Sequence, residues 1–78
     1  MVKQYTEEQY EQAKNLIAFR QQASVMMVNR AITKRYIPAA QIIDRLEDEG
    51  HIGKYEGNNK PRKVFIKPSI ENNLGADI

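Results

Sequence analysis

The chain has 78 residues, a formal net charge of +2 and no cysteine. This length allows one small domain, which buries only about 60% of its unfolded surface. The lack of cysteine excludes a disulfide framework and a thiolate metal site, and it is typical of a cytoplasmic protein. The sequence contains no apolar run near the roughly 18 residues of a membrane span, no signal-peptide pattern and no internal repeat.

The composition favours a binding protein over an enzyme. His51 is the only histidine, and the Ser and Thr hydroxyls are limited to Thr6, Ser24, Thr33 and Ser69. Thr6 and Ser24 occupy expected helix N-cap positions, which is a structural role. A catalytic set of nucleophile, base and orienting group would have to be assembled around His51 alone. A lone histidine with scattered carboxylates is also a poor metal site, so we expect no metal and no cofactor.

The first predicted element is a helix over residues 7–20. Thr6 is a good N-cap, and Gln9 three residues later completes a capping box. The apolar side chains follow the helical spacing and form one stripe, which consists of Tyr10, Ala13, Leu16 and Ile17. This helix is interpreted as a cover for the hydrophobic core.

A shorter second helix is expected to begin after Ala23-Ser24, with Val25, Val28 and Ile32 on one face. It ends near Ile32, where residues 33–35 form a tight basic turn. Met26 and Met27 cannot both be buried on the Val25 face, and one of them is expected to pack against the first helix.

The third helix is predicted over residues 36–49, with Pro38 in its first turn, where a proline is tolerated. Gly50 follows as a left-handed C-cap. The expected buried stripe is Ala39, Ile42, Ile43 and Leu46. The opposite face carries Ile37, Gln41, Asp44, Arg45 and Asp48.

After Gly50 the hydrophobic period changes to that of strands. Residues 52–55 are predicted as a short strand, residues 56–59 as a turn and residues 63–67 as the return strand. Pro68 ends this hairpin, and residues 68–78 are expected to form a flexible tail. The predicted fold is therefore α+β: a winged helix-turn-helix over residues 1–67, with three helices followed by a two-stranded β-hairpin wing.

The charges are unevenly distributed on this fold. Residues 23–35 carry three cations and no acid, whereas the third helix is acidic. Residues 51–67 carry five cations against Glu56. Such cations neutralise DNA phosphates, although lysine-rich hairpins are also often simply solvated. The predicted phosphate contacts are Arg30, Lys34, Arg35, Lys54, Lys60, Arg62 and Lys63. The predicted base-reading residues are Ile37, Pro38, Gln41, Asp44 and Arg45.

Several residues occur in a familiar order. They are Ala23-Ser24, Val28 and Arg30, then Tyr36-x-x-Ala39-Ala40-x-x-Ile43, Leu46-Glu47-x-x-Gly50, and finally Gly53, Gly57 and Lys60-Pro61-Arg62 before Val64. In this set the segment 5–66 resembles the gamma domain at the C-terminus of FtsK/SpoIIIE-type DNA translocases. The resemblance implies a winged-helix module that recognises short G-rich sequences and contacts a XerD-type recombinase.

The chain departs from the family at the residues that the resemblance assigns to base reading. Ile37 stands at the position of an Asn, Gln41 at that of an Arg, and Pro38 replaces a second Arg, while Asp44 keeps the acidic character. Gln suits adenine and Ile suits a thymine methyl, so a different target sequence is expected. Arg35 stands where the family usually has Gly, and a positive φ there would strain the backbone.

Two functions are compatible with these observations. The first is a sequence-preferring double-stranded DNA-binding protein, acting as a homo-oligomer or as several copies on DNA. The second is a protein-interaction module that keeps the fold and binds a recombinase, a translocase or another nucleic-acid enzyme. The 78 residues contain no phosphate-binding loop of a motor. The initial Met1 and the tail favour a free-standing protein over a translocase fragment.

Overall fold

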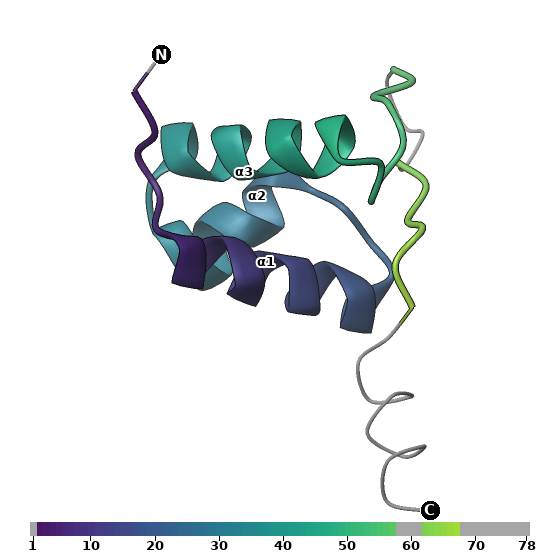
Figure 1. Ribbon diagram of the computed structural model, residues 1–78, viewed down its shortest axis with the longest axis horizontal. Coiled ribbons are helices and arrows are strands. Elements are labelled where there is room, and N and C mark those ends of the chain that lie inside the picture. The colour runs from purple at the N-terminus through teal and green to yellow at the C-terminus, as the bar shows by residue number, and fades with distance from the viewer. Residues whose placement is uncertain (1, 58–61, 68–78) are drawn as a thin grey trace, which may run out of the picture.

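The computed structural model describes residues 2–57 and 62–67, which fold into three α-helices. The order is α1 (Glu7–Arg20), α2 (Val25–Val28), a π-helical turn η1 (Asn29–Thr33) and α3 (Tyr36–Asp48). Figure 1 shows α1 and α3 crossing the molecule one above the other, with α2 behind them. Within the described part of the chain, no helix has both the length and the apolar character needed to cross a bilayer.

The predicted first helix and its cap are confirmed. The Thr6 hydroxyl accepts a hydrogen bond from the Gln9 backbone N–H, and the Gln9 side chain accepts one from the Thr6 N–H, each at 3.0 Å. α1 ends at Arg20 and is capped by Gln21, which has a left-handed backbone with φ 55° and donates its N–H to the Ile17 carbonyl at 2.7 Å. Local capping chemistry therefore sets both ends of α1.

The second helix begins at the predicted cap, where the Ser24 hydroxyl accepts from the Met27 N–H at 3.3 Å. It widens after Val28 into η1 and closes with Lys34, whose N–H bonds the Asn29 carbonyl five residues back at 2.7 Å. Lys34 has φ 62°, whereas Arg35 is extended with φ −137°. Strain at Arg35 was expected only if that position needed a positive φ, and the structure places the positive φ one residue earlier, at Lys34.

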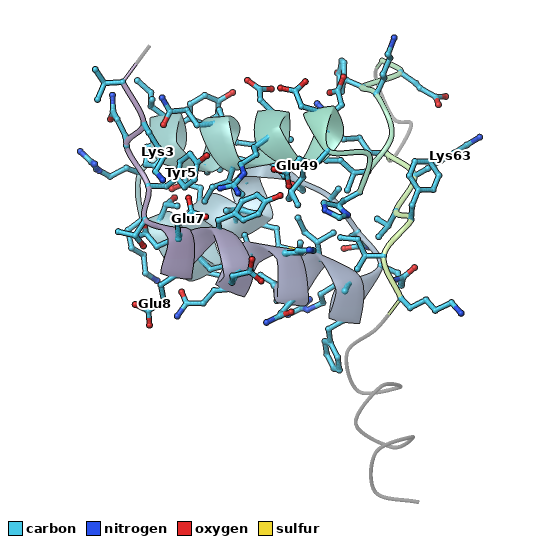
Figure 2. All side chains as sticks on the ribbon, viewed as in Figure 1. Lys3, Tyr5, Glu7, Glu8, Glu49 and Lys63 are labelled. Carbon is cyan, nitrogen blue, oxygen red and sulfur yellow. The ribbon has the colours of Figure 1, made fainter. Side chains whose placement is uncertain are left out.

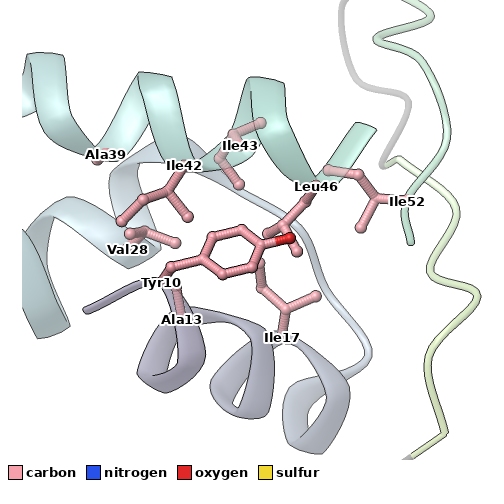
Figure 3. Packing of buried hydrophobic residues seen from close by; sticks show 9 residues of the cluster. All are labelled: Tyr10, Ala13, Ile17, Val28, Ala39, Ile42, Ile43, Leu46 and Ile52. Carbon is pink, nitrogen blue, oxygen red and sulfur yellow. The ribbon is translucent and has the colours of Figure 1, made fainter. Parts of the chain in front are cut away.

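The core lies between α1, α2 and α3 and contains the predicted stripe of the third helix. Figure 3 shows Ile42, Ile43 and Leu46 facing Tyr10 and Ile17 of α1. The buried cluster is Tyr10, Ala13, Ile17, Val28, Ala39, Ile42, Ile43, Leu46 and Ile52. Leu16, which was expected in the α1 stripe, is only half-buried, and Ala18 is buried. The predicted left-handed cap after α3 is confirmed at Gly50, with φ 81°.

Among residues 51–57 and 62–67, the predicted wing shows one antiparallel bridge, between Ile52 and Val64. Its two hydrogen bonds join the Gly53 N–H to the Lys63 carbonyl at 2.8 Å and the Phe65 N–H to the His51 carbonyl at 2.9 Å. The two predicted strands are absent from the residues that the structure describes. Glycine at position 53 weakens strand pairing. The Ile66 carbonyl accepts a hydrogen bond from the Gln21 side chain at 2.8 Å, which attaches the end of the wing to α1.

Two predictions lie outside the described residues. The predicted wing turn included Asn58 and Asn59, and the predicted tail covered residues 68–78.

Candidate nucleic-acid interface

The face of α3 that points away from the core carries Ile37 and Asp44. Ile37 is half exposed, with 50% of its surface accessible, and Asp44 is also exposed. Pro38, in contrast, is buried among the core-facing residues of α3. Position 38 lies a full helical turn from Ile42 on the core-facing side, so Pro38, which was predicted to read bases, has little surface available for such a contact.

Gln41 lies on the same exposed face, but its side-chain amide is already engaged. Residues 2–5 form an extended segment before α1, called here the arm. The Gln41 Oε1 accepts from the Gln4 backbone N–H at 2.7 Å, and the Gln41 Nε2 donates to the Val2 carbonyl at 2.9 Å. Figure 1 shows the arm beside the first turns of α3.

Arg45 is also engaged by carboxylates of the same chain, although its side chain is 31% exposed. Its guanidinium donates to both carboxylate oxygens of Glu7, at 2.9 and 3.1 Å, and to Glu49 at 3.0 Å. It lies over the Tyr10 ring, with 3.7 Å from the guanidinium carbon to the ring centre, which is a cation–π contact. Arg45 therefore joins α3 to α1, and the arm residue Lys3 binds the same Glu7 at 2.6 Å.

This network shifts several pKa values in the folded protein. Hydrogen bonds from Lys3 and Arg45 lower the pKa of Glu7. Hydrogen bonds from Tyr10 and Arg45 lower the pKa of Glu49. Burial, together with the hydrogen bond to the Glu49 carboxylate, raises the pKa of Tyr10. Figure 2 shows Lys3, Tyr5 and Glu7 close together, whereas Glu8 points away from α3.

The turn between the second and third helices brings together three exposed cations: Arg30, Lys34 and Arg35. The Lys34 ammonium donates to the Arg30 carbonyl at 2.7 Å. The Thr33 hydroxyl donates to the Arg35 carbonyl at 2.6 Å, which fixes the backbone where α3 begins. None of the three cations makes a salt bridge to a carboxylate among the described residues.

The predicted wing cations fall into different environments. Lys54 and Lys63 are exposed, and Figure 2 shows Lys63 pointing outward from the molecule. Arg62 has only 14% of its side chain exposed and bonds Glu47 at 2.8 Å and the Gly53 carbonyl at 3.1 Å. Arg62 therefore ties the wing to α3. Lys60 lies outside the described residues.

Sequence reasoning missed the arm. Lys3 and Tyr5 line a groove of about 410 Å³ together with four residues of α3, namely Gln41, Asp44, Arg45 and Asp48. No local pattern indicates that residues 2–5 lie against a helix 37 residues further along the chain.

A second cation was also missed. Arg20, at the end of α1, lines a depression of about 490 Å³ that it shares with Arg30. The described residues contain no group of three His, Cys, Asp or Glu side chains able to hold a metal ion.

The sequence is similar to that of known proteins. The family model of the FtsK gamma domain matches residues 4–67. The chain is 42% identical over 72 residues to a DNA translocase FtsK of Oceanobacillus iheyensis, covering 91% of this chain and 9% of that protein. It is 43% identical over 71 residues to DNA translocase SpoIIIE of Bacillus subtilis, with the same coverage of both chains.

A DNA translocase FtsK of Listeria monocytogenes is 41% identical over 66 residues, covering 85% of this chain and 9% of that protein. The chain spans about 9% of the length of these curated relatives. The family match covers most of the chain, and it includes all three helices and both segments of the bridge. The chain therefore belongs to the FtsK gamma domain family.

Proposed function

We propose that this chain is a non-catalytic, sequence-preferring module that binds double-stranded DNA in the cytoplasm. The observation that carries the proposal is the exposed face of α3 next to a turn with three exposed cations. An α-helix is about 10–12 Å across with its side chains, and the major groove is about 12 Å wide. α3 therefore fits the groove, with Ile37 and Asp44 directed toward base edges.

The phosphate contacts in this proposal come from the exposed cations alone. Arg30, Lys34 and Arg35 contact one strand, and Lys54, Lys63 and Lys60 contact the backbone next to the wing. The wing is formed by the two segments that the Ile52–Val64 bridge joins. Arg45 and Arg62 are left out, because carboxylates of the same chain already hold both guanidinium groups.

Base preference follows from the chemistry of the remaining side chains. Ile37 offers apolar contact to a thymine methyl group, and Asp44 accepts a hydrogen bond from a cytosine amino group. One small module makes few base contacts, so several copies along the DNA, or a homo-oligomer, supply the rest of the specificity. The names of the relatives, which are DNA translocases, support DNA as the ligand.

The test is selection of bound duplexes from a random pool, followed by titration of the selected duplex at rising salt concentration. We expect one enriched sequence and an affinity that falls linearly on logarithmic axes of binding constant and salt. Absence of binding at low salt would contradict the proposal. Enrichment of no sequence would leave only non-specific binding and remove the proposed preference.

A second candidate function is supported by exposed apolar side chains. Met26, Tyr36 and Tyr55 are 48%, 59% and 64% exposed, respectively, and they line one depression of about 300 Å³. Aromatic residues and Met are enriched at protein interfaces. The partner would be a XerD-type recombinase or another DNA-processing enzyme. Capture of a purified recombinase that persists at high salt, and in a variant lacking the turn cations, would favour this function.

A further inference from the structure

The contact between the arm and α3 uses the one edge of Gln41 that is able to recognise a base. In a primary amide, the oxygen and one N–H lie side by side and form a single bidentate edge. Adenine is read by this edge, through its N6 amino group and N7. In this protein the edge faces the arm, where it pairs with the Gln4 N–H at 2.7 Å and the Val2 carbonyl at 2.9 Å.

The two arm groups that Gln41 binds lie on either side of Lys3. In an extended chain, the carbonyl of one residue and the N–H two residues later point to the same side, as they do toward a neighbouring strand. Gln41 thus takes the place of a strand partner and fixes the backbone of Lys3. The Lys3 side chain stays 50% exposed, with its ammonium against the exposed carboxylate of Glu7.

The arm also has the right position relative to a bound duplex. Figure 1 shows the arm beside the first turns of α3, and residues 50–57 beyond the last turn. A helix about 10–12 Å wide fills a groove about 12 Å wide, so elements beside the helix meet the phosphate backbones. An exposed lysine–carboxylate pair contributes little, about 0–1 kcal/mol, and a phosphate easily replaces its carboxylate.

From these contacts we infer that Gln41 is a positioning residue that holds the arm against α3, and that Lys3 is a phosphate contact. This inference rests on the proposed function. It reassigns Gln41, which reads no base in this arrangement, and it adds the arm to the DNA-binding surface. The base preference then depends on Ile37 and Asp44.

The experiment measures binding of a short labelled duplex, carrying the sequence selected from a random pool, to the full chain at several salt concentrations. Gln41→Ala removes both arm hydrogen bonds, and Gln4→Pro removes the backbone N–H without changing the charge. Gln4→Ala is the matched control, because it keeps that N–H. Lys3→Ala removes only the proposed phosphate contact.

We expect Gln41→Ala, Gln4→Pro and Lys3→Ala each to weaken binding about 3–10-fold, for the selected duplex and for a scrambled one alike. The magnitude of the salt slope should fall by about one in each case. The double variant Gln41→Ala with Lys3→Ala should bind no more weakly than Lys3→Ala alone. Gln4→Ala should bind like the unmodified chain.

Two results would overturn the inference while leaving the proposed function intact. One is a change of preference at a single base pair in Gln41→Ala, with Gln4→Pro unaffected, because Gln41 would then be a reader. The other is tighter binding by Gln4→Pro, which would make the arm a cover over the DNA-binding face. An unmodified chain that binds no duplex would contradict the proposed function itself.

A measurement without DNA tests the contact directly. Amide hydrogen exchange at Gln4 should be slower in the unmodified chain than in Gln41→Ala, because the hydrogen bond protects this N–H. Equal exchange rates would show that Gln41 does not hold the arm.

Discussion

The cations that the sequence assigns to DNA binding fall into two groups in the structure, those paired with carboxylates of the same chain and those that are exposed. At the seam between α1 and α3 and at the base of the wing, Arg45 and Arg62 are each held by carboxylates of the same chain. At the turn, Arg30, Lys34 and Arg35 are exposed and make no salt bridge to a described carboxylate. Basic residues near a recognition helix therefore serve two purposes, and only their surroundings separate stabilising from binding cations.

The largest expected effect is on DNA binding by the turn. The double variant Lys34→Ala with Arg35→Ala should weaken binding about ten-fold or more for each charge, because hydrogen bonds to charged groups contribute about 1.5–3 kcal/mol. The loss of affinity should be similar for all DNA sequences. The free energy of unfolding should change by only about 0.5 kcal/mol or less. Fluorescence anisotropy and thermal unfolding measure the two quantities. Unchanged affinity would show that the exposed cations of the turn do not bind DNA.

The held cations should show the reverse behaviour. Arg62→Ala removes hydrogen bonds to Glu47 and Gly53, so we expect a loss of about 1–3 kcal/mol in the free energy of unfolding. The neighbouring exposed residue provides the matched control: Lys63→Ala should leave stability within about 0.5 kcal/mol and weaken DNA binding instead. Urea unfolding of both variants decides the comparison. Equal stabilities would mean that Arg62 does not anchor the wing.

Lys34 combines both roles, because it is an exposed cation with a left-handed backbone at φ 62°. Lys34→Gly relieves the steric cost of that conformation, which is about 1 kcal/mol or more for a residue with a Cβ atom. Glycine also loses more backbone entropy on folding, so we expect a net gain of at most about 1 kcal/mol. DNA binding should weaken at the same time. If the free energy of unfolding falls along with the affinity for DNA, the backbone at Lys34 is not strained.

The pH dependence of stability reports on the seam. The pKa values of Glu7 and Glu49 are lowered on folding, so their contribution is complete above about pH 4.5 and is lost as the pH falls through the folded values. The pKa of Tyr10 is raised, so its contribution is complete below about pH 10 and is lost as the pH rises further. Tyr10→Phe should remove the alkaline loss, measured by thermal unfolding across pH, whereas Tyr55→Phe should retain it.

Much of the fold could be predicted from the sequence, because the signals are local. Thr6 with Gln9 marks the start of α1, Ser24 marks the start of α2, and Gly50 marks the end of α3. The core face of α3 follows from its apolar spacing. The wide turn of η1 was missed, because an extra residue per turn leaves no mark in a hydrophobic pattern. The two strands were predicted, but the described residues contain only one bridge in their place.

The candidate site was harder to predict, because its decisive contacts join distant residues. Gln41 was placed correctly on the exposed face of α3, yet its partners lie 37 and 39 residues away in the arm. Arg45 and its partner Glu7 are 38 residues apart. Pro38 follows Ile37 in the first turn of α3, but its side chain is buried on the core-facing side of the helix. Surface patterns show which residues have suitable chemistry, and only tertiary contacts show which are free to use it.

The link between Gln21 and the end of the wing has a mechanical consequence. The Gln21 amide donates to the Ala18 and Ile66 carbonyls, at 2.6 and 2.8 Å, so the segment leaving the wing is attached to the end of α1. A pulling force applied beyond Lys67 loads this attachment first and then the two hydrogen bonds of the Ile52–Val64 bridge. These bonds open one after another, whereas α1 and α3 share a packed interface that must separate as a whole. We therefore expect the segment after Val64 to detach first under load, because Ile52 belongs to the buried core and Arg62 is bound to Glu47.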